Sequence, residues 1–211
     1  MNKENILLYL SVRFILHGFY KICFFFKATG RKFVPKSGGC IIASNHLSYL
    51  DPMVLSIASP RILNFLAKRD LFKGFFGVMI SALNAFPVER GKGDLKAIRT
   101  SLGKLKDGKA LIVFPEGTRS TNGQIKDAES GVGMLAAKSG VAVVPTYIIG
   151  TDLALPAKEK KFSLFIPISV HFAAPLSFDG LGLDPKNKND YQIFADKVIE
   201  SIRELKSKNC L

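Results

Sequence analysis

Cysteine is scarce in this sequence: the 211 residues include only Cys23, Cys40 and Cys210. An odd number of widely separated cysteines matches neither a disulfide framework nor a cysteine-based metal site. This usage is typical of a protein that lies in the cytosol or faces it. The chain is long enough to bury a hydrophobic core as one domain, so its stability needs neither disulfides nor a metal.

Acidic residues are also few, at 17 Asp and Glu against 30 Lys and Arg, which gives a formal net charge of +13. This balance indicates nucleic acid, anionic lipid or a phosphorylated substrate as the partner. The sequence has no tryptophan but 17 phenylalanines, and 47% of its residues are hydrophobic. Since no nucleic-acid-binding motif is visible, we expect anionic membrane lipids as the partner and no nucleic acid.

A long uncharged apolar run is missing as well. Residues 6–26 are mostly apolar, but three polar side chains recur at four-residue steps: Arg13, His17 and Lys21. On a helix these form one narrow polar stripe, with Lys27 close to it. A central Arg or Lys costs about 2.5–3.5 kcal/mol in a membrane-spanning helix, which disfavours a span. The same charges disfavour a secretory signal.

We therefore expect residues 1–30 to form a membrane-interface segment. It would be an amphipathic helix, or a helix pair bent near Gly18, that contacts an anionic membrane through Arg13, Lys21 and Lys27. The protein would then be peripheral or monotopic, on the cytoplasmic face of the cell membrane. The alternative is an amphipathic helix that packs on the protein's own core.

Residues 31–211 alternate between apolar strand patterns and amphipathic helix patterns. This alternation predicts an α/β fold, with a sheet that is covered by helices on both faces. The expected strands cover residues 40–43, 62–67, 86–88, 110–114, 141–149 and 164–172. The expected helices cover residues 53–59, 95–105 and 130–138, part of 71–85, and a last segment from residue 189 or 190.

The stretch from Asn45 to Pro52 places a histidine and a carboxylate where a strand meets a helix. Residues five apart on a helix differ by about 140°, so His46 and Asp51 can meet only if the backbone turns between them. With Asp51 as N-cap and Pro52 as the first helical residue, the carboxylate could reach one ring nitrogen of His46. That contact would fix the tautomer and make the other nitrogen a base.

Two alternatives remain for this stretch. Asp51 can be only a helix cap, and His46 only a polar loop residue. Ser48 lies close to His46, but no G-x-S-x-G elbow surrounds it, which disfavours a serine nucleophile.

A second polar stretch, residues 115–120, follows the expected strand 110–114. Glu116, Thr118 and Arg119 could all point out of the sheet edge there. Arg119 offers a planar fork that suits phosphate, and backbone amides around Gly117 can add donors. Glu116 could accept from a substrate hydroxyl or hold Arg119 in place. A solvated pair between Glu116 and Arg119 is the alternative.

Basic residues also follow two other expected strands, namely Lys68 and Arg90. In an open α/β sheet the strand ends converge on one rim. We therefore expect Lys68, Arg90 and Arg119 to lie near His46, a convergence more specific than any single motif.

Four blocks of the sequence together resemble the 1-acyl-sn-glycerol-3-phosphate acyltransferases of the glycerolipid acyltransferase family. They read N-H-x-S-x-x-D at 45–51, F-P-V-E-R at 86–90, F-P-E-G-T-R-S at 114–120 and V-P-T-Y-I-I-G at 144–150. Their order and spacing fit over residues 33–150. The fold that the resemblance implies is a mixed, mostly parallel sheet flanked by helices.

The resemblance also implies a reaction. His46 would be the general base that takes a proton from the sn-2 hydroxyl of lysophosphatidic acid, and Asp51 would orient it. The oxygen would attack the thioester of acyl-CoA or acyl-carrier protein, giving phosphatidic acid without a cofactor or a metal. The implied substrate-binding residues are Lys68, Arg90, Glu116, Gly117, Thr118 and Arg119.

The stretch from Asp127 to Gly131 is acidic where many relatives are basic, which leaves the acceptor open. Glycerol 3-phosphate, another lysophospholipid or a lyso-aminolipid are alternatives. From different classes, a thioesterase or lipase, or a non-catalytic membrane-binding module, also stay open. The sequence does not indicate the oligomeric state.

Overall fold

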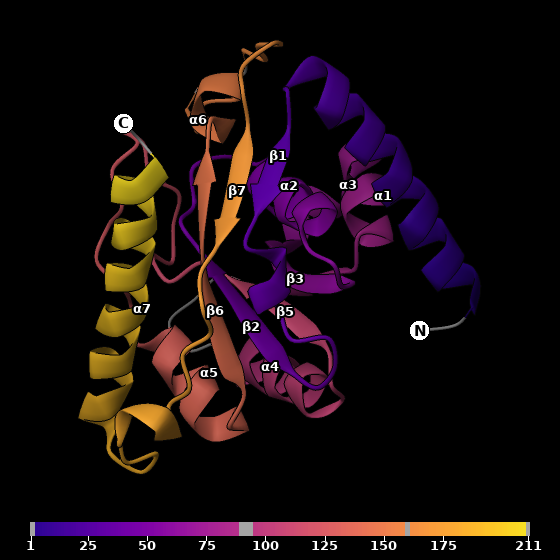
Figure 1. Cartoon of the computed structure of the whole chain (residues 1–211). Helices are drawn as coiled ribbons and strands as arrows, with labels where there is room; N and C mark the ends of the chain where they lie inside the picture. The colour runs from indigo at the N-terminus through magenta and orange to yellow at the C-terminus, as the bar shows by residue number, and fades with distance from the viewer. Residues whose placement is uncertain (1–2, 89–94, 159–160, 210–211) are drawn as a thin grey trace.

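The computed structural model describes residues 3–88, 95–158 and 161–209. A seven-stranded sheet runs through it in the order β1-β7-β6-β2-β5-β3-β4 (Figure 1). β6 and β7 pair antiparallel, and the other neighbouring strands pair parallel, which confirms the mixed, mostly parallel sheet. The strands are β1 Lys27–Thr29, β2 Cys40–Ser44, β3 Leu63–Lys68, β4 Ala85–Val88, β5 Ala110–Val113, β6 Ala142–Ile149 and β7 Ser169–Phe172.

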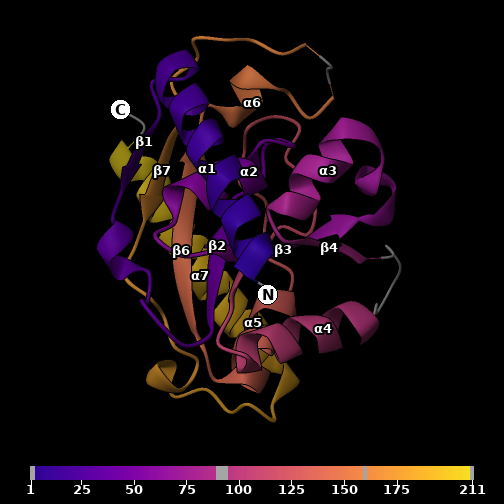
Figure 2. The same ribbon diagram turned by 90° about the vertical axis from the view of Figure 1, so that its right-hand side faces the viewer.

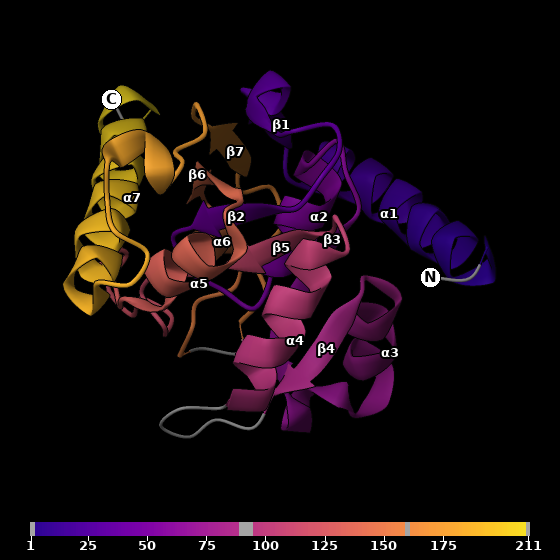
Figure 3. The ribbon, with the colours of Figure 1, turned by 90° about the horizontal axis from the view of Figure 1, so that it is seen from below.

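Helices cover both faces of this sheet. One face carries α1 Lys3–Cys23, α2 Asp51–Ala58 and α3 Gly74–Ala82, and the other carries α4 Leu95–Lys106, α5 Gly131–Ser139 and α7 Lys188–Asn209. α1 and α7 lie on opposite sides of the sheet (Figures 2 and 3). The short elements are α6 Thr151–Ala154 and the 3₁₀ turns Arg31–Phe33, Arg69–Phe72 and Asp179–Leu181.

The central strand β2 shows why two cores form. All five of its residues are buried. Cys40 and Ile42 belong to the core under α1, α2 and α3, whereas Ile41 and Ala43 belong to the core under α5 and α7. Successive side chains of a strand point to opposite faces, so a continuous apolar run suits a sheet covered on both sides.

Some elements differ from those expected. The strand expected over 164–172 is shorter, since β7 covers only Ser169–Phe172. β1 and α6 were not expected at all. β1 has three residues, and β7 is its one neighbouring strand among the described residues, so no local pattern marks it. Because β1 precedes residue 31, the sheet begins inside the segment expected to form only the membrane interface.

α1 is one continuous helix, so the alternative of a helix pair bent near Gly18 is wrong. Its inner side packs on the protein: Tyr9 and Tyr20 are buried, and the Tyr9 hydroxyl accepts a hydrogen bond from the Leu63 amide at 3.2 Å. Arg13 also turns inward, against expectation. It donates to the carbonyl of Ser59 at 2.6 Å, at the carboxyl end of α2, where a cation is favourable.

The outer side of α1 is apolar and exposed, and Phe14 alone is 81% exposed. Its large exposed side chains are Ile6, Leu7, Leu8, Leu10, Phe14, Ile15, Phe19 and Ile22. Lys21 and Lys27 are exposed as well. By length and composition alone, Ile6–Cys23 could cross a membrane, and only 11% of it is buried. The alternative of packing on the protein's own core is therefore confirmed for the inner side of the helix, and the exposed apolar outer side fits membrane association.

Candidate active site

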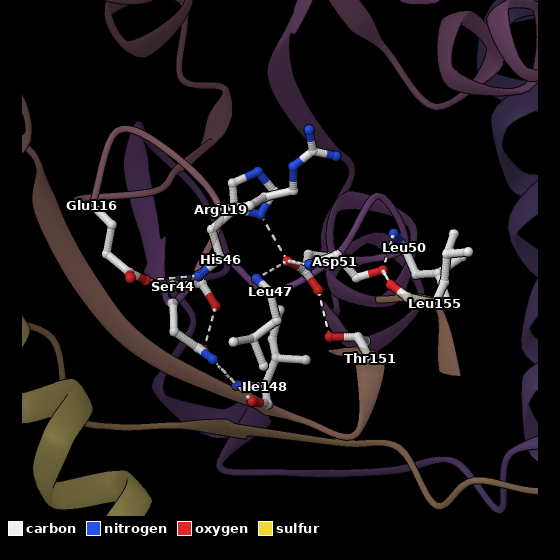
Figure 4. Close-up of polar contacts among 12 residues, drawn as sticks. Ser44, His46, Leu47, Leu50, Asp51, Glu116, Arg119, Ile148, Thr151 and Leu155 are labelled. Carbon is white, nitrogen blue, oxygen red and sulfur yellow. Dashed lines mark hydrogen bonds and ion pairs between the residues drawn. The ribbon is translucent and has the colours of Figure 1, made fainter. Parts of the chain in front are cut away.

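The turn between β2 and α2 brings His46 and Asp51 together. His46 Nδ1 lies 2.7 Å from Asp51 Oδ2 (Figure 4). The expected contact is confirmed, but the capping prediction is off by one residue: Leu50 is the N-cap, and Asp51 and Pro52 are the first two helical residues. The carboxylate caps the turn instead, since Asp51 Oδ2 accepts from the amides of Leu47 at 2.6 Å and Ser48 at 2.8 Å.

Asp51 is fully buried, and its second oxygen is also bound. Oδ1 accepts a hydrogen bond from the Thr151 hydroxyl at 2.6 Å. With donors on every side, Asp51 acts as an acceptor only, so His46 Nδ1 carries the ring proton. His46 Nε2 is then the free acceptor, which is the arrangement of a general base with an orienting carboxylate.

His46 lies at the wall of a pocket of about 250 Å³. The imidazole stacks on Phe114, with ring centroids 3.8 Å apart and planes 12° apart, and its side chain is 14% exposed. Apolar side chains from α2, β3 and α3 line much of the rest, among them Met53, Phe65 and Phe76. The pocket therefore joins one base to an apolar chamber, as an acyl chain requires. A larger hollow of about 490 Å³ lies near the amino ends of β3 and β4 and includes none of these motif residues.

Glu116 does not point out of the sheet edge as expected. It is buried, and its two oxygens accept from backbone amides: Oε1 from His46 at 2.8 Å and Oε2 from Lys126 at 2.9 Å. Burial raises the pKa of the Glu116 carboxyl, which these hydrogen bonds partly offset. The alternative of a solvated pair between Glu116 and Arg119 is therefore wrong as well. Glu116 instead fastens the His46 turn to residues 115–126, together with the Ser120 amide, which donates to the His46 carbonyl at 2.7 Å.

Arg119 lies over an aromatic ring, with its guanidinium carbon 3.5 Å from the centroid of Tyr49. This cation–π contact holds the planar fork beside the pocket wall that Tyr49 forms. Thr118 Oγ1 accepts from Lys126 Nζ at 3.0 Å, and the same ammonium donates to the Arg119 carbonyl at 2.9 Å. The loop thus presents two cationic side chains, Arg119 and Lys126.

Gly117 has φ +67°, which favours glycine, and a Cβ there would lie 2.5 Å from a carboxylate oxygen of Glu129. The acidic residue that departs from the family pattern therefore lies directly against this loop.

Lys68, at the end of β3, lines the pocket and pairs with Asp70 at 2.6 Å, both half exposed. The structure thus brings His46, Lys68 and Gly117 to one pocket, while Arg90 lies outside the described residues.

Sequence reasoning gave no role to several residues that hold this site. Asn45 connects the His46 turn to β6 through its side chain. Its Nδ2 donates to the Ile148 carbonyl at 3.0 Å, and its Oδ1 accepts from the Ile148 backbone amide at 2.7 Å. Thr151, Tyr49 and Lys126 are the others. Asn45 and Tyr49 lie within the first block, and Thr151 directly follows the fourth, so position in or beside a block was the available signal. Lys126 carries no such mark.

Comparison with known proteins shows the family from the sequence and a shared fold from the structure. Residues 25–149 match the family model described as Acyltransferase. The chain is 31% identical over 145 residues to a chloroplastic 1-acyl-sn-glycerol-3-phosphate acyltransferase of Arabidopsis thaliana, covering 67% of this chain and 39% of the relative. It is 26% identical over 188 residues to the 1-acyl-sn-glycerol-3-phosphate acyltransferase of Borreliella burgdorferi, covering 84% and 72%.

The match to the plant relatives is partial, since the chain spans 39% of the Arabidopsis protein and 35% of a Brassica napus one. Among solved structures, the crystal structure of the 1-acyl-sn-glycerophosphate acyltransferase of Thermotoga maritima superposes with a TM-score of 0.66. That match has 24% identity and covers 96% of this chain and 97% of the other, so the two chains share a fold.

Proposed function

Because the chain belongs to the Acyltransferase family, we propose that it is an O-acyltransferase, and that it acylates the sn-2 hydroxyl of 1-acyl-sn-glycerol 3-phosphate to give phosphatidic acid. The observation that carries this proposal is the hydrogen bond from His46 Nδ1 to the buried Asp51, which leaves Nε2 as the acceptor of a ring that lines a pocket with mostly apolar walls. The names of the relatives support the acceptor.

The proposed reaction needs one base and an activated donor. His46 Nε2 takes the proton of the acceptor hydroxyl as the oxygen attacks the carbonyl carbon of an acyl thioester. The ester C–O bond forms and the C–S bond breaks, and the imidazolium returns its proton to the leaving thiolate. Asp51 holds the ring and stabilises the imidazolium, and the thioester of acyl-CoA or acyl-carrier protein supplies the activation.

The charges around the pocket suit a phosphate-bearing acceptor. Lys68 lies in the pocket wall, and Arg119 is held above Tyr49 with its fork available for a phosphate. Glu129 lies against Gly117 and counts against a second anionic group there. We place the phosphate of the acceptor at Lys68 and Arg119, and its acyl chain among Met53, Phe65 and Phe76.

The outer side of α1 suits a membrane that carries these lipids. Its exposed apolar side chains would lie in the acyl boundary of one leaflet, with Lys21 and Lys27 among the head groups. We propose that the protein binds the cytoplasmic face of the cell membrane in this way. Arg13 makes no part of this contact, because it is bound to Ser59.

The test uses purified protein in vesicles with labelled acyl-CoA or acyl-carrier protein, with and without lysophosphatidic acid. We expect phosphatidic acid only with the acceptor, and a loss of about 10²–10⁴-fold in rate for His46→Ala. Arg119→Ala should mainly raise KM for the acceptor, while the matched Arg203→Ala on α7 should change neither constant. Circular dichroism of each variant controls for folding.

The other outcomes separate the alternative functions. Free fatty acid that forms without any acceptor would indicate a thioesterase. Vesicle binding without turnover, unchanged in His46→Ala, would indicate a non-catalytic membrane module. A serine hydrolase is disfavoured already, because Ser48 is fully buried and its hydroxyl donates to the Leu155 carbonyl at 2.7 Å.

A further inference from the structure

Two phenylalanines, Phe25 and Phe165, combine a strained backbone conformation with an exposed apolar side chain. Phe25 has φ +48° and Phe165 has φ +61°, in the left-handed region that bulky side chains rarely adopt. Both side chains are also exposed, Phe25 to 53% and Phe165 to 64%. Inside the described fold, neither ring is buried enough to offset the backbone conformation that presents it. Such strain is expected where the side chain has a partner outside the chain.

The two residues lie on segments that are joined to each other. The Phe165 amide donates to the Cys23 carbonyl at 2.8 Å, and the Ile168 amide donates to the Phe24 carbonyl at 2.9 Å. The rings of Phe24 and Phe162 contact edge to face, with centroids 5.7 Å apart. Residues 161–168, which we call the apolar loop, are therefore fixed to the carboxyl end of α1.

The exposed side chains of this loop continue the apolar outer side of α1. Phe162, Leu164 and Phe165 are exposed on the loop, and Ile22 is exposed on the last turn of α1. Exposed lysines flank the junction on both segments, namely Lys21, Lys27, Lys158 and Lys161. Aromatic and aliphatic side chains bordered by lysines form the pattern of a surface that lies in an anionic lipid interface.

We propose that the apolar loop and Phe25 form a second membrane-inserting element, which enters the leaflet beside α1. This inference rests on the membrane binding of α1 proposed above, and it assigns a role to the segment that follows the fourth sequence block. The partner of this element is an anionic membrane surface, because its apolar side chains are continuous with those of α1 and the flanking side chains are lysines.

The loop is also connected to the catalytic turn. The Ser163 amide donates to the Ala154 carbonyl at 2.8 Å, and the next carbonyl, that of Leu155, accepts from Ser48 beside His46. α6, which precedes Leu155, supplies the Thr151 hydroxyl to Asp51. The inserted loop would thus hold the catalytic turn at a fixed height above the lipid. Loop variants should raise KM for a membrane-borne acceptor and leave turnover of a short-chain soluble acceptor unchanged.

The absence of tryptophan allows a direct test. Three single-tryptophan variants of the full chain are made: Phe165→Trp, Phe14→Trp on α1, and Ile193→Trp at an exposed apolar site on α7. Each is mixed with vesicles of phosphatidylcholine and phosphatidylglycerol that carry brominated acyl chains. We expect a blue shift and quenching for the tryptophans at 165 and 14, and neither change at 193.

The outcomes distinguish this inference from the function on which it rests. Quenching at 14 without quenching at 165 would overturn the second element and leave α1 as the membrane contact. Quenching at neither position would contradict membrane insertion of both the apolar loop and α1. Equal quenching at 193 would show non-specific adsorption and also overturn the inference.

A second variant removes the side chain without depending on fluorescence. Phe165→Gly places glycine where φ is positive, so the urea midpoint should not fall appreciably. Its affinity for the same vesicles should drop about tenfold, because the insertion of one aromatic side chain is lost. The matched Leu181→Ser removes an exposed apolar side chain from another surface and should bind like the parent. Parent-like vesicle binding by Phe165→Gly would contradict the proposal.

Discussion

At the scale of single residues, Thr151 is the clearest case of a side chain that acts through another. Its hydroxyl is the donor to Asp51 Oδ1, at 2.6 Å in a fully buried site. Thr151→Val keeps the shape but leaves that oxygen without its partner, which loosens the orientation of His46. We expect kcat to fall about 10–100-fold with KM nearly unchanged, as measured by steady-state acyl transfer.

Thr151→Ser supplies the control for this prediction, since it restores the hydroxyl and should recover most of the rate. A parallel loss in both variants would show that the methyl packing of Thr151 matters and that the hydrogen bond does not.

Glu116 should leave a signature in the pH dependence of stability. Burial raises the pKa of its carboxyl above the ordinary value of 4.5, so the folded state holds the proton more tightly than the unfolded state. This contribution is fully present below pH 4.5 and is lost as pH rises through the folded pKa. The free energy of unfolding of the wild type should therefore decline relative to Glu116→Gln as pH rises from 4.5 towards 7, measured by urea titration.

A constant difference between the two proteins over that range would show that the hydrogen bonds from His46 and Lys126 offset burial completely. Only the decline with pH distinguishes Glu116 as a buried scaffold of the site, because an exposed carboxyl would also give a constant difference.

At the scale of elements, the strands predicted best from the sequence are those buried on both faces. β2, β5 and β6 have continuous apolar runs that only a covered sheet accommodates, and their ends set the position of His46 and of the Glu116 loop. β1 was missed because its stability comes from β7, which lies far along the chain. Local patterns do not contain such a pairing.

The same limit applies to the site. The pair of His46 and Asp51 follows from spacing and a turn signal, both of which are local. That Glu116 turns inward depends on amides 70 and 10 residues away, and the donor Thr151 lies 100 residues from Asp51. The sequence predicts that the charged side chains lie at the strand ends on one side of the sheet. It does not predict their hydrogen-bond partners, because tertiary packing sets those.

The contact between β1 and β7 predicts a second pH effect. His171 on β7 lies between Thr29 Oγ1 and Ser169 Oγ, each 2.9 Å from a ring nitrogen, and burial lowers the pKa of this histidine below 6.5. The folded state therefore resists protonation, so the stabilising contribution is present above pH 6.5 and is lost as pH falls through the folded pKa. We expect the wild type to lose stability relative to His171→Gln between pH 7 and pH 5.

Urea titrations at several pH values measure this difference. A wild type that gains stability relative to the variant on acidification would contradict the lowered pKa, and with it the partly buried environment of His171.

At the scale of the whole molecule, charge and apolar surface are separate contributions to the proposed membrane binding. The net charge is +13, while the side chains that would enter the lipid are concentrated on the outer side of α1 and on the apolar loop. Attraction of the charges acts over a Debye length, about 10 Å at 0.1 M salt, whereas insertion depends on apolar contact. Salt should therefore weaken the electrostatic attraction and leave the apolar insertion unchanged.

This separation gives the last prediction. Binding to vesicles with phosphatidylglycerol should weaken as KCl rises from 50 to 500 mM, and should level off at the affinity measured on phosphatidylcholine alone. The double variant Lys21→Gln/Lys27→Gln should reduce the salt dependence, because each lysine near an anionic surface contributes about 1 kcal/mol. The double variant Lys188→Gln/Lys208→Gln on α7 carries the same net charge and should retain the full dependence. If the two double variants behave alike, binding follows the total charge, and α1 does not face the membrane.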